Sequence, residues 1–370
     1  MKKIAIYIRN KELTPSSYYR IVQYTKGIQG EVLFREIAPK SIYKLKISSS
    51  NKSFILRIFI NALYYLVMLF RVCYFLLVDN INIPNCVIVS KTFCPRYSPF
   101  FLIAFIKRLS IKSELIWDFD DYIFISGEIS KRQKKVIEKY SKKIIVTNEY
   151  LKQKINPIFQ HKVLLMPTTD GDLQGFDSKE LLGQRSKKFS SEIRLVWVAT
   201  SGNIRHLMRI LDALDSAADK LFLTSNKQLI LTIVCDKPIE YKTRKLVLRN
   251  ITWTREKAKE EIYNSHIGLM PLINGEYTKG KGGFKLIQYI STGLPVVASN
   301  VGFNDEVVDK SCGILVDDYI NTDLWIDSIV SLSNDEVRWC EMSRNAYLKW
   351  SDKFSFSKNM ESWNMIIHNK

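Results

Sequence analysis

Short apolar stretches alternate with helix-length segments along the amino-terminal part of the chain. Runs rich in Val, Ile and Leu occupy residues 3–9, 31–34, 85–90, 113–119 and 142–148. Each run predicts a buried β-strand. Strands that alternate with helices are typical of a mainly parallel sheet that carries helices on both faces. The pattern therefore predicts an α/β architecture for this region.

A polar stretch separates this region from a second one of the same kind. Residues 170–192 are rich in Gly, Ser and charged residues, which predicts a linker. Beyond it, apolar runs predict strands at residues 193–200, 229–236, 251–253, 267–272, 295–299 and 313–316. We therefore expect two α/β domains, at residues 1–175 and 190–350, with a helix at about residues 352–370 that packs back onto the first domain.

Positive charge is concentrated near the amino terminus. The net charge is +18, and residues 1–113 alone carry 18 Lys and Arg against 4 Asp and Glu. Such an excess predicts an anionic partner for the first domain. The sequence contains no zinc-finger spacing, RNP aromatic motif or compact basic run. It therefore favours a membrane surface, and we expect no nucleic-acid partner.

The longest apolar segment covers residues 54–78, where Arg57, Asn61 and Arg71 interrupt the apolar residues. An arginine near the bilayer centre costs about 2.5–3.5 kcal/mol on insertion scales, so a transmembrane span is disfavoured. Two interpretations stay open: a core helix of the first domain, or an interfacial helix that lies on lipid. The amino-terminal apolar run is too short for a signal peptide, and the six cysteines lack C-x-x-C spacing. We therefore expect a cytoplasmic protein with reduced thiols.

A glycine-rich loop comes before the helix predicted at residues 284–292. Gly280, Gly282 and Gly283 lie in this loop, and glycines at a helix entrance let backbone N–H groups approach a ligand. The helix dipole favours an anion at the same place. Lys285, in the first turn, is unfavourable for the dipole unless such an anion is bound, and Gln288 shares its helix face. These features predict a phosphate site.

This segment, GFKLIQYISTGLPVVASNVGFNDEVV, resembles glycosyltransferase family 4, as do the loop PSSYYRIVQY and the stretch IWDFDDYIF. The resemblance covers nearly the whole chain. It implies the retaining mechanism and the GT-B fold of that family, in which two Rossmann-like domains face each other across a cleft. The family's donor helix carries two Glu eight residues apart, and their positions here hold Gly280 and Gln288. Gln288 can still exchange hydrogen bonds with a ribose. Either Glu276 reaches the sugar, or Lys285 contacts the phosphates instead; we prefer the second.

The resemblance also implies roles for individual residues. Lys285 and Arg205 are expected to stabilise the departing diphosphate, while Asp120 and Asp121 orient sugar or acceptor hydroxyls. The other donor-binding residues are expected to be Ser201, Gly202, Lys281, Gly282, Gly283, Phe284 and Gln288. On the acceptor or phosphate side of the first domain, the expected residues are Ser16, Ser17, Tyr19 and Arg20.

The carboxylates after residue 117 allow a second interpretation. In a GT-A-type transferase, Asp118 and Asp120 would clamp a metal ion. We favour the first interpretation, because the basic helix entrance and Arg205 already supply positive charge. The four His residues show no ligand spacing, so we expect no metal site.

Together these features predict a retaining glycosyltransferase that moves a hexose from a nucleotide-diphosphate sugar to a lipid-linked or membrane-associated glycan acceptor. The expected setting is the assembly of bacterial surface polysaccharide, such as O-antigen, capsule or lipopolysaccharide. We expect the enzyme to need no cofactor or metal, and to act peripherally on the inner face of the cell membrane. The alternatives are a non-catalytic GT-B-like protein that binds glycan or lipid, and the metal-dependent GT-A-type transferase.

Overall fold

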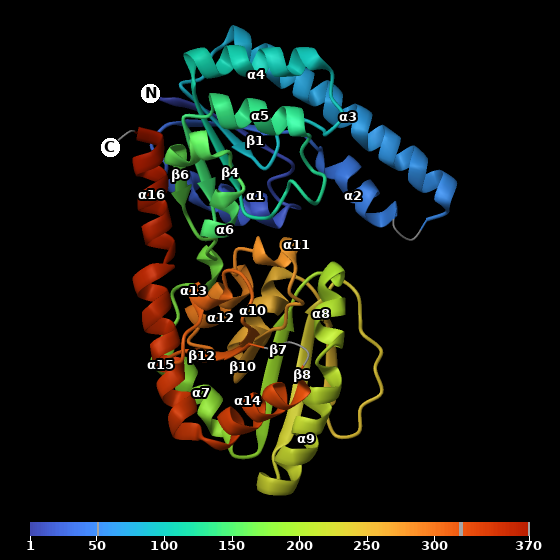
Figure 1. The fold of residues 1–370 in the computed structure, drawn as a ribbon, viewed down its shortest axis with the longest axis vertical. Coiled ribbons are helices and arrows are strands. Elements are labelled where there is room, and N and C mark those ends of the chain that lie inside the picture. The colour runs from blue at the N-terminus through green and yellow to red at the C-terminus, as the bar shows by residue number, and fades with distance from the viewer. Residues whose placement is uncertain (50–51, 318–320, 369–370) are drawn as a thin grey trace. The chain divides into compact units, whose positions relative to one another are not determined.

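The computed structural model describes residues 1–49, 52–317 and 321–368, and the chain forms two compact units. Unit 1 comprises Met1–Thr168 and Ser357–Lys370, and unit 2 comprises Thr169–Phe356. Within these described ranges, each unit contains one six-stranded sheet with helices packed against it (Figure 1). All described strand pairs are parallel.

The sheet of unit 1 has the strand order β2-β1-β3-β4-β5-β6. Its strands are β1 (Lys3–Ile8), β2 (Glu31–Glu36), β3 (Cys86–Ser90), β4 (Glu114–Phe119), β5 (Lys143–Val146) and β6 (Val163–Leu165). The five runs that predict strands all form strands. The sixth strand, β6, was not predicted, because three half-exposed residues at the edge of a sheet are too short to show a period.

The helices of unit 1 surround this sheet. They are α1 (Pro15–Arg20), α2 (Lys40–Ser48), α3 (Phe54–Ile81), α4 (Phe100–Lys112), α5 (Lys131–Tyr140), α6 (Glu149–Gln153) and α16 (Phe356–His368), with the 3₁₀ turns η1 (Val22–Gly27) and η3 (Pro157–Lys162). α16 packs on unit 1 through Trp363, whose indole N–H donates to the Arg20 carbonyl at 3.0 Å. Lys143 donates to the Ile366 carbonyl in the last turn of α16. A cation at this end of a helix interacts favourably with the helix dipole.

The sheet of unit 2 has the strand order β12-β11-β10-β7-β8-β9. Its strands are β7 (Glu192–Val198), β8 (Gln228–Cys235), β9 (Val247–Thr252), β10 (Ile267–Met270), β11 (Val296–Ser299) and β12 (Gly313–Val316). All six runs that predict strands in this region are confirmed, although β9 begins four residues earlier than expected. The first half of β9 was not predicted, because Arg249 and Asn250 interrupt the apolar pattern of the sequence. Polar residues of this kind are tolerated on an edge strand.

The helices of unit 2 include the one predicted after the glycine-rich loop. They are α7 (Ser178–Phe189), α8 (Ile204–Met208), α9 (Leu211–Ser225), α10 (Arg255–Tyr263), α11 (Glu276–Lys279), α12 (Phe284–Ser291), α13 (Asn304–Val307), α14 (Thr322–Asn334) and α15 (Glu336–Lys353), with the 3₁₀ turns η4 (Gly171–Leu173) and η5 (Ser201–Asn203). α12 packs beside β10, where Gly268 makes room for the Tyr289 ring: a Cβ at Gly268 would lie 2.5 Å from Tyr289 Cδ2.

The prediction of a linker at residues 170–192 is wrong. This stretch forms η4 and α7 and belongs to unit 2. Asp177 caps α7 by accepting from the backbone N–H groups of Lys179 and Glu180. Leu181 and Phe189 are buried, but α7 has three apolar residues in all, among many charged ones, which is too weak a period to predict a helix.

Arg185 of α7 is the main anchor of this segment. Its buried guanidinium donates to the carbonyls of Ile262 and Tyr263 in α10 and of Thr292 just after α12, at 2.9–3.0 Å. It also donates to the Thr292 hydroxyl at 3.1 Å. Burial lowers the pKa of Arg185 to about 9, so the side chain stays charged at neutral pH. The cation therefore binds the negative ends of two helices at once.

We expect Arg185→Met to destabilise the protein by about 3 kcal/mol, because it leaves buried carbonyls without donors. The measurement is the free energy of unfolding from urea titration. Arg344→Met is the matched control, since Arg344 is exposed on α15, and we expect it to change stability by no more than about 0.5 kcal/mol. Equal stability of the two variants would contradict this role of Arg185.

Candidate functional site

Both units place their candidate site residues beyond the carboxyl ends of parallel strands. In unit 2, these residues follow β7 and β10, and in unit 1 they follow β1, β3 and β4. Ligands of open α/β sheets bind at this edge, because the loops and helix N-termini meet there.

The glycine-rich loop of unit 2 leads directly into α12. Gly283 has a φ of 59° at the N-cap of α12, in the left-handed region that favours glycine. A Cβ at this position would also lie 3.0 Å from the Phe303 ring and 3.1 Å from Val307. The loop therefore has a fixed conformation that places its backbone at the positive end of the helix.

Lys285, Gln288 and Asp170 form a hydrogen-bonded chain at the start of α12. Lys285 Nζ donates to Gln288 Oε1 at 3.1 Å, and Gln288 Nε2 donates to Asp170 Oδ2 at 2.6 Å. Burial lowers the pKa of Lys285 to about 8, while Asp170 opposes and Lys281 adds to this shift. Burial also raises the pKa of Asp170. The positive charge of Lys285 is thus poorly compensated, as expected of a site that binds an anion.

Two more cations lie close to this chain. Lys281 Nζ donates to Asn203 Oδ1 and so joins the glycine-rich loop to η5, which follows β7. Arg205 is exposed in the first turn of α8. The structure therefore brings together three of the predicted cations, Arg205, Lys281 and Lys285, at one edge of unit 2.

The pKa of His206 indicates the sign of the electrostatic potential at this edge of unit 2. Its side chain is buried, and Nδ1 accepts from the backbone N–H of Ile273 at 3.1 Å. Burial lowers the pKa of His206 to about 4, with further lowering by the charges of Lys281 and Arg205. The ring is therefore neutral at pH 7, and its proton is on Nε2. Burial is the main cause of this neutral state, and the further lowering of the pKa by Lys281 and Arg205 indicates a positive potential here.

The remaining predicted donor residues differ in their surroundings. The backbone N–H and hydroxyl of Ser201 donate to Asp236, after β8, at 2.6 and 2.8 Å. Gly202 is exposed, whereas Gly282 is buried. Phe284 is half-buried, and its ring centroid lies 5.0 Å from Lys285 Nζ. Ser201 thus serves first to hold the η5 loop against β8.

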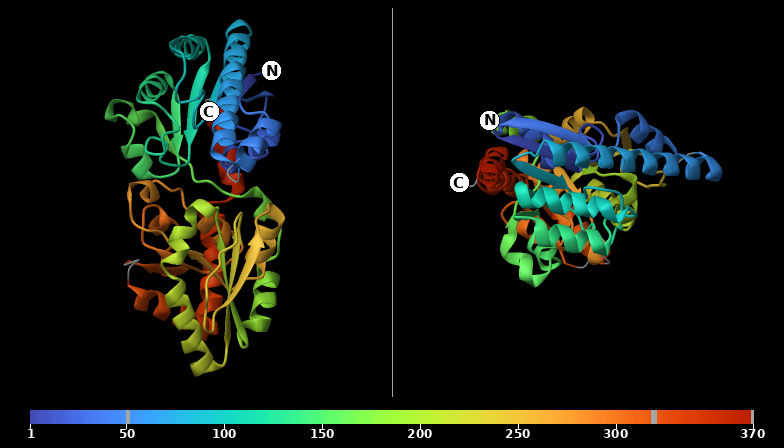
Figure 2. Two further views of the ribbon diagram at one scale, coloured as in Figure 1. Left: turned by 90° about the vertical axis from the view of Figure 1, so that its right-hand side faces the viewer. Right: turned by 90° about the horizontal axis from the view of Figure 1, so that it is seen from above.

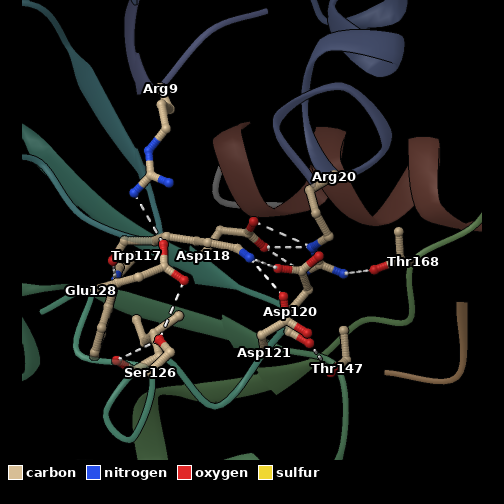
Figure 3. A network of polar contacts seen from close by, with 12 residues as sticks. Arg9, Arg20, Trp117, Asp118, Asp120, Asp121, Ser126, Glu128, Thr147 and Thr168 are labelled. Atoms are coloured by element: carbon tan, nitrogen blue, oxygen red, sulfur yellow. Dashed lines mark hydrogen bonds and ion pairs between the residues drawn. The ribbon is translucent and has the colours of Figure 1, made fainter. Parts of the chain in front are cut away.

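In unit 1, Lys91 lies between the two predicted carboxylates, since its Nζ lies 3.0 Å from Asp120 Oδ1 and 2.7 Å from Asp121 Oδ2. Figure 3 labels both aspartates. Lys91 directly follows β3 and has a φ of 61°, which is unusual for a residue with a side chain. The Asp118 carbonyl accepts from the Lys91 N–H at 2.7 Å, and the Trp117 indole donates to the Lys91 carbonyl at 2.9 Å. These two bonds hold the strained conformation that aims Lys91 at the carboxylates.

The pKa of Asp120 is shifted toward neutral pH. Burial raises the pKa of Asp120 to about 6, although Lys91 opposes this shift. Asp120 does not cap a helix, because the next helix, α5, is capped by Ser130. Its carboxylate is therefore available as a hydrogen-bond acceptor with a tunable charge.

A pocket beside Lys91 contains two of the predicted acceptor-side serines. Arg9 lies at its wall, where Arg9 Nη2 contacts Glu128 Oε2 at 3.1 Å. The residues that line the pocket are Arg9, Thr14, Ser16, Ser17, Ile37, Ser90, Lys91, Thr92 and Glu128. Most of these side chains have hydroxyl or charged groups, so the pocket is suited to a ligand rich in hydroxyls.

Arg20 and Tyr19, which the sequence places on the acceptor or phosphate side, are both buried in the interior of unit 1. The Arg20 guanidinium is buried and forms a bidentate ion pair with Asp118 (Figure 3). Its Nη1 also donates to the Met166 carbonyl and to Thr168 Oγ1. Tyr19 is likewise only 5% exposed. Arg20 therefore neutralises a buried carboxylate, and Asp118 is not available as half of a metal clamp. Among residues 1–49, 52–317 and 321–368, no cluster of three His, Cys, Asp or Glu side chains is arranged to hold a metal ion.

Sequence reasoning missed Lys91 and Asp170. Lys91 is one lysine among many, and nothing in its neighbours predicts a positive φ. Asp170 lies in the stretch interpreted as a linker, 118 residues before Gln288. A pairing over such a distance gives no local signal. The position of Lys91 directly after a predicted strand was the one available indication.

Comparisons with known proteins agree with this architecture. Residues 193–335 match the family model described as "Glycosyl transferases group 1". No curated protein matches the sequence significantly. The expectation of a glycosyltransferase is confirmed by this domain, which lies within unit 2.

Solved structures share the fold over the full chain. HepE of Anabaena, in complex with UDP and glucose, has a TM-score of 0.66 at 10% identity, with 100% of both chains covered. A glycosyltransferase from Rickettsia africae has a TM-score of 0.62 at 13% identity, covering 100% of this chain and 98% of that one. WaaG, a glycosyltransferase involved in lipopolysaccharide biosynthesis, has a TM-score of 0.59 at 14% identity, with 99% of each chain covered. These likenesses confirm the GT-B fold, and the GT-A alternative is wrong.

We expect nucleotide release from a nucleotide sugar to depend on pH with a bell-shaped profile of kcat/KM. The acid limb lies near pH 6, because ionised Asp120 is lost as the pH falls through its pKa. The alkaline limb lies near pH 8, because protonated Lys285 is lost as the pH rises through its pKa. Asp120→Asn is expected to remove the acid limb alone, and Lys285→Arg to move the alkaline limb upward. A wild-type profile that is flat across both pH values would contradict these assignments.

Proposed function

We propose that the protein is a retaining hexosyltransferase of the family 4 type, which transfers a hexose from a nucleotide-diphosphate sugar to a lipid-linked or membrane-associated glycan acceptor. The proposed setting is bacterial surface polysaccharide assembly. The observation that carries the proposal is the start of α12, where Lys285 lies in the first turn beside Gln288 and close to Lys281. A glycine N-cap, a helix dipole and the poorly compensated charge of Lys285 are together suited to a diphosphate.

The chemistry follows from where charge develops. When the bond between the sugar and the diphosphate breaks, negative charge accumulates on the leaving diphosphate, and preorganised cations stabilise it. Lys285, Lys281 and Arg205 would supply that stabilisation. We propose on this basis that the reaction needs no metal ion. Gln288, in the position where the family carries its second Glu, would contact the nucleotide while Asp170 fixes its amide.

The acceptor is proposed to bind unit 1. Asp120, with Lys91 beside it, would orient an acceptor hydroxyl, and the pocket that contains Ser16 and Ser17 would hold further hydroxyls. The basic, apolar character of this unit supports a peripheral location on the cytoplasmic face of the membrane. The HepE structure contains UDP and glucose, and WaaG is involved in lipopolysaccharide biosynthesis. UDP-hexoses are therefore the first donors to test.

We expect UDP to bind the protein and to raise its melting temperature, because a ligand that binds the folded state alone stabilises it. Lys285→Ala is expected to weaken UDP binding in calorimetry by about 10- to 100-fold, as expected for the loss of a charge-assisted contact. Lys187→Ala on the exposed face of α7 is the matched control and should bind UDP as the wild type does. If none of the common nucleoside diphosphates binds, the proposed function fails and a non-catalytic glycan-binding protein is favoured.

We expect the product to keep the anomeric configuration of the donor. Proton NMR of the transfer product, or of the sugar released by slow hydrolysis, reports the configuration directly. An α-linked donor should give an α-anomer as the first product. A β-anomer would show inversion and would move Asp120 from an orienting role to that of a general base.

A further inference from the structure

We propose that the outer face of α3 and α4 in unit 1 docks on an anionic lipid bilayer, with α3 lying in the plane of the interface. This inference deepens the membrane association proposed above and rests on it. Among the described residues, α3 is the one helix that is long and apolar enough to cross a membrane by length and composition. The structure gives reasons for binding to the surface instead.

α3 is apolar on two opposite faces. One stripe packs on unit 1 and is buried: Ile60, Tyr64, Met68, Val72, Phe75 and Leu76. The opposite stripe is 46–81% exposed: Ile55, Phe59, Leu66, Phe70, Tyr74, Leu77 and Ile81. The outer face of a helix in water is normally polar. A continuous row of exposed aromatic and aliphatic side chains along 28 residues, or about 42 Å, therefore indicates a binding surface.

α4 extends this apolar surface. Asn80 near the end of α3 donates to the Phe105 carbonyl of α4 at 3.3 Å, and both views place the two helices side by side (Figures 1 and 2). Phe100, Phe101 and Ile111 of α4 are 69%, 40% and 78% exposed. At its amino-terminal end, α3 projects beyond the sheet of unit 1 (Figure 2), and residues 54–59 are exposed there without exception.

The charges around this surface favour anionic lipid as the occupant. From residue 37 to residue 113, the sequence contains 11 Lys and Arg and one acidic residue, Asp79. Asp79 is fully buried, so it does not reduce the positive potential outside. Exposed basic side chains accompany the apolar ones on α3, α4 and the segment before α3: Lys44, Lys52, Arg57, Arg108 and Lys112. An apolar face with basic residues beside it is the pattern of an interfacial helix on an anionic membrane.

Contacts at the buried face of α3 hold the helix against unit 1. Tyr7 donates to Asp79 at 2.6 Å, and Arg35 Nε donates to both Asp79 oxygens at 3.1 Å. Arg71 Nε donates to the Glu36 carbonyl at 2.8 Å. A spanning orientation would break these bonds and move Asp79 into lipid, where an ionised carboxylate is strongly disfavoured. In-plane docking keeps every one of them.

The test is flotation of the full-length protein with vesicles of phosphatidylglycerol and phosphatidylcholine, and with vesicles of phosphatidylcholine alone. We expect the wild type to float with the anionic vesicles, to be released as salt increases, and to be extracted by alkaline carbonate. Phe59→Asp/Phe70→Asp is expected to lower the bound-to-free ratio by about tenfold or more, since it removes two exposed rings. Arg57→Glu/Arg108→Glu is expected to lower it by about 30-fold or more, since it removes two basic residues and adds two acidic ones.

Ile158→Asp is the matched control. Ile158 is 71% exposed in η3 of the same unit, so this variant should float as the wild type does. Flotation of Phe59→Asp/Phe70→Asp at the wild-type level, absence of wild-type flotation, or resistance to carbonate would each overturn the proposal. A change from dimer to monomer in Phe59→Asp/Phe70→Asp would do so too, because a second copy would then cover the face. Thermal shift with UDP on the same samples reports the proposed function separately, since the substitutions in unit 1 should leave that shift unchanged.

Discussion

A single buried guanidinium fixes the helix on which the candidate donor site depends. Arg185 of α7 binds the carbonyl ends of α10 and α12 with four hydrogen bonds and has no carboxylate as a partner among them. Because its carboxyl end is held in this way, α12 presents its amino end in one position. Gly283 and Lys285 lie at that end. Recognition of a charged group requires such a rigid support, because small displacements weaken charge-assisted contacts strongly.

The buried lysines of the two candidate sites, Lys285 and Lys91, have opposite electrostatic surroundings. In unit 2, burial keeps the pKa of Lys285 near 8, so a cation there gains stability from an incoming anion. In unit 1, burial works against the charge of Lys91, yet Asp120 and Asp121 hold its pKa well above the ordinary value. This lysine is already satisfied by carboxylates. The first arrangement suits a diphosphate, and the second suits neutral hydroxyl groups that accept and donate hydrogen bonds.

α3 explains why its segment supports two interpretations of the sequence. Its buried stripe makes it a core helix of unit 1, and its exposed stripe gives it the character of an interfacial helix. A helix with only one apolar face would show a clear period of polar residues. In α3 both faces are apolar, so the sequence shows no helical period of polar residues. The composition of the segment therefore resembles that of a membrane-spanning helix. The contacts of Asp79 and Arg71 determine which face of α3 packs on unit 1 and which stays exposed.

The sequence by itself determined eleven of the twelve strands found among the described residues, the α/β class, and the glycine-rich entrance to α12, because apolar runs and glycines act locally. It did not determine α7, because Arg185 in its centre is charged and a charged residue predicts an exposed position. Only the tertiary structure brings the carbonyls of α10 and of Thr292 to its guanidinium. Nor did the sequence determine that Arg20 is a buried partner of Asp118 or that Lys91 lies between two aspartates. Charged groups far apart in the chain meet only when the sheet is assembled, so only the tertiary structure decides which charges are neutralised and which remain to bind a ligand.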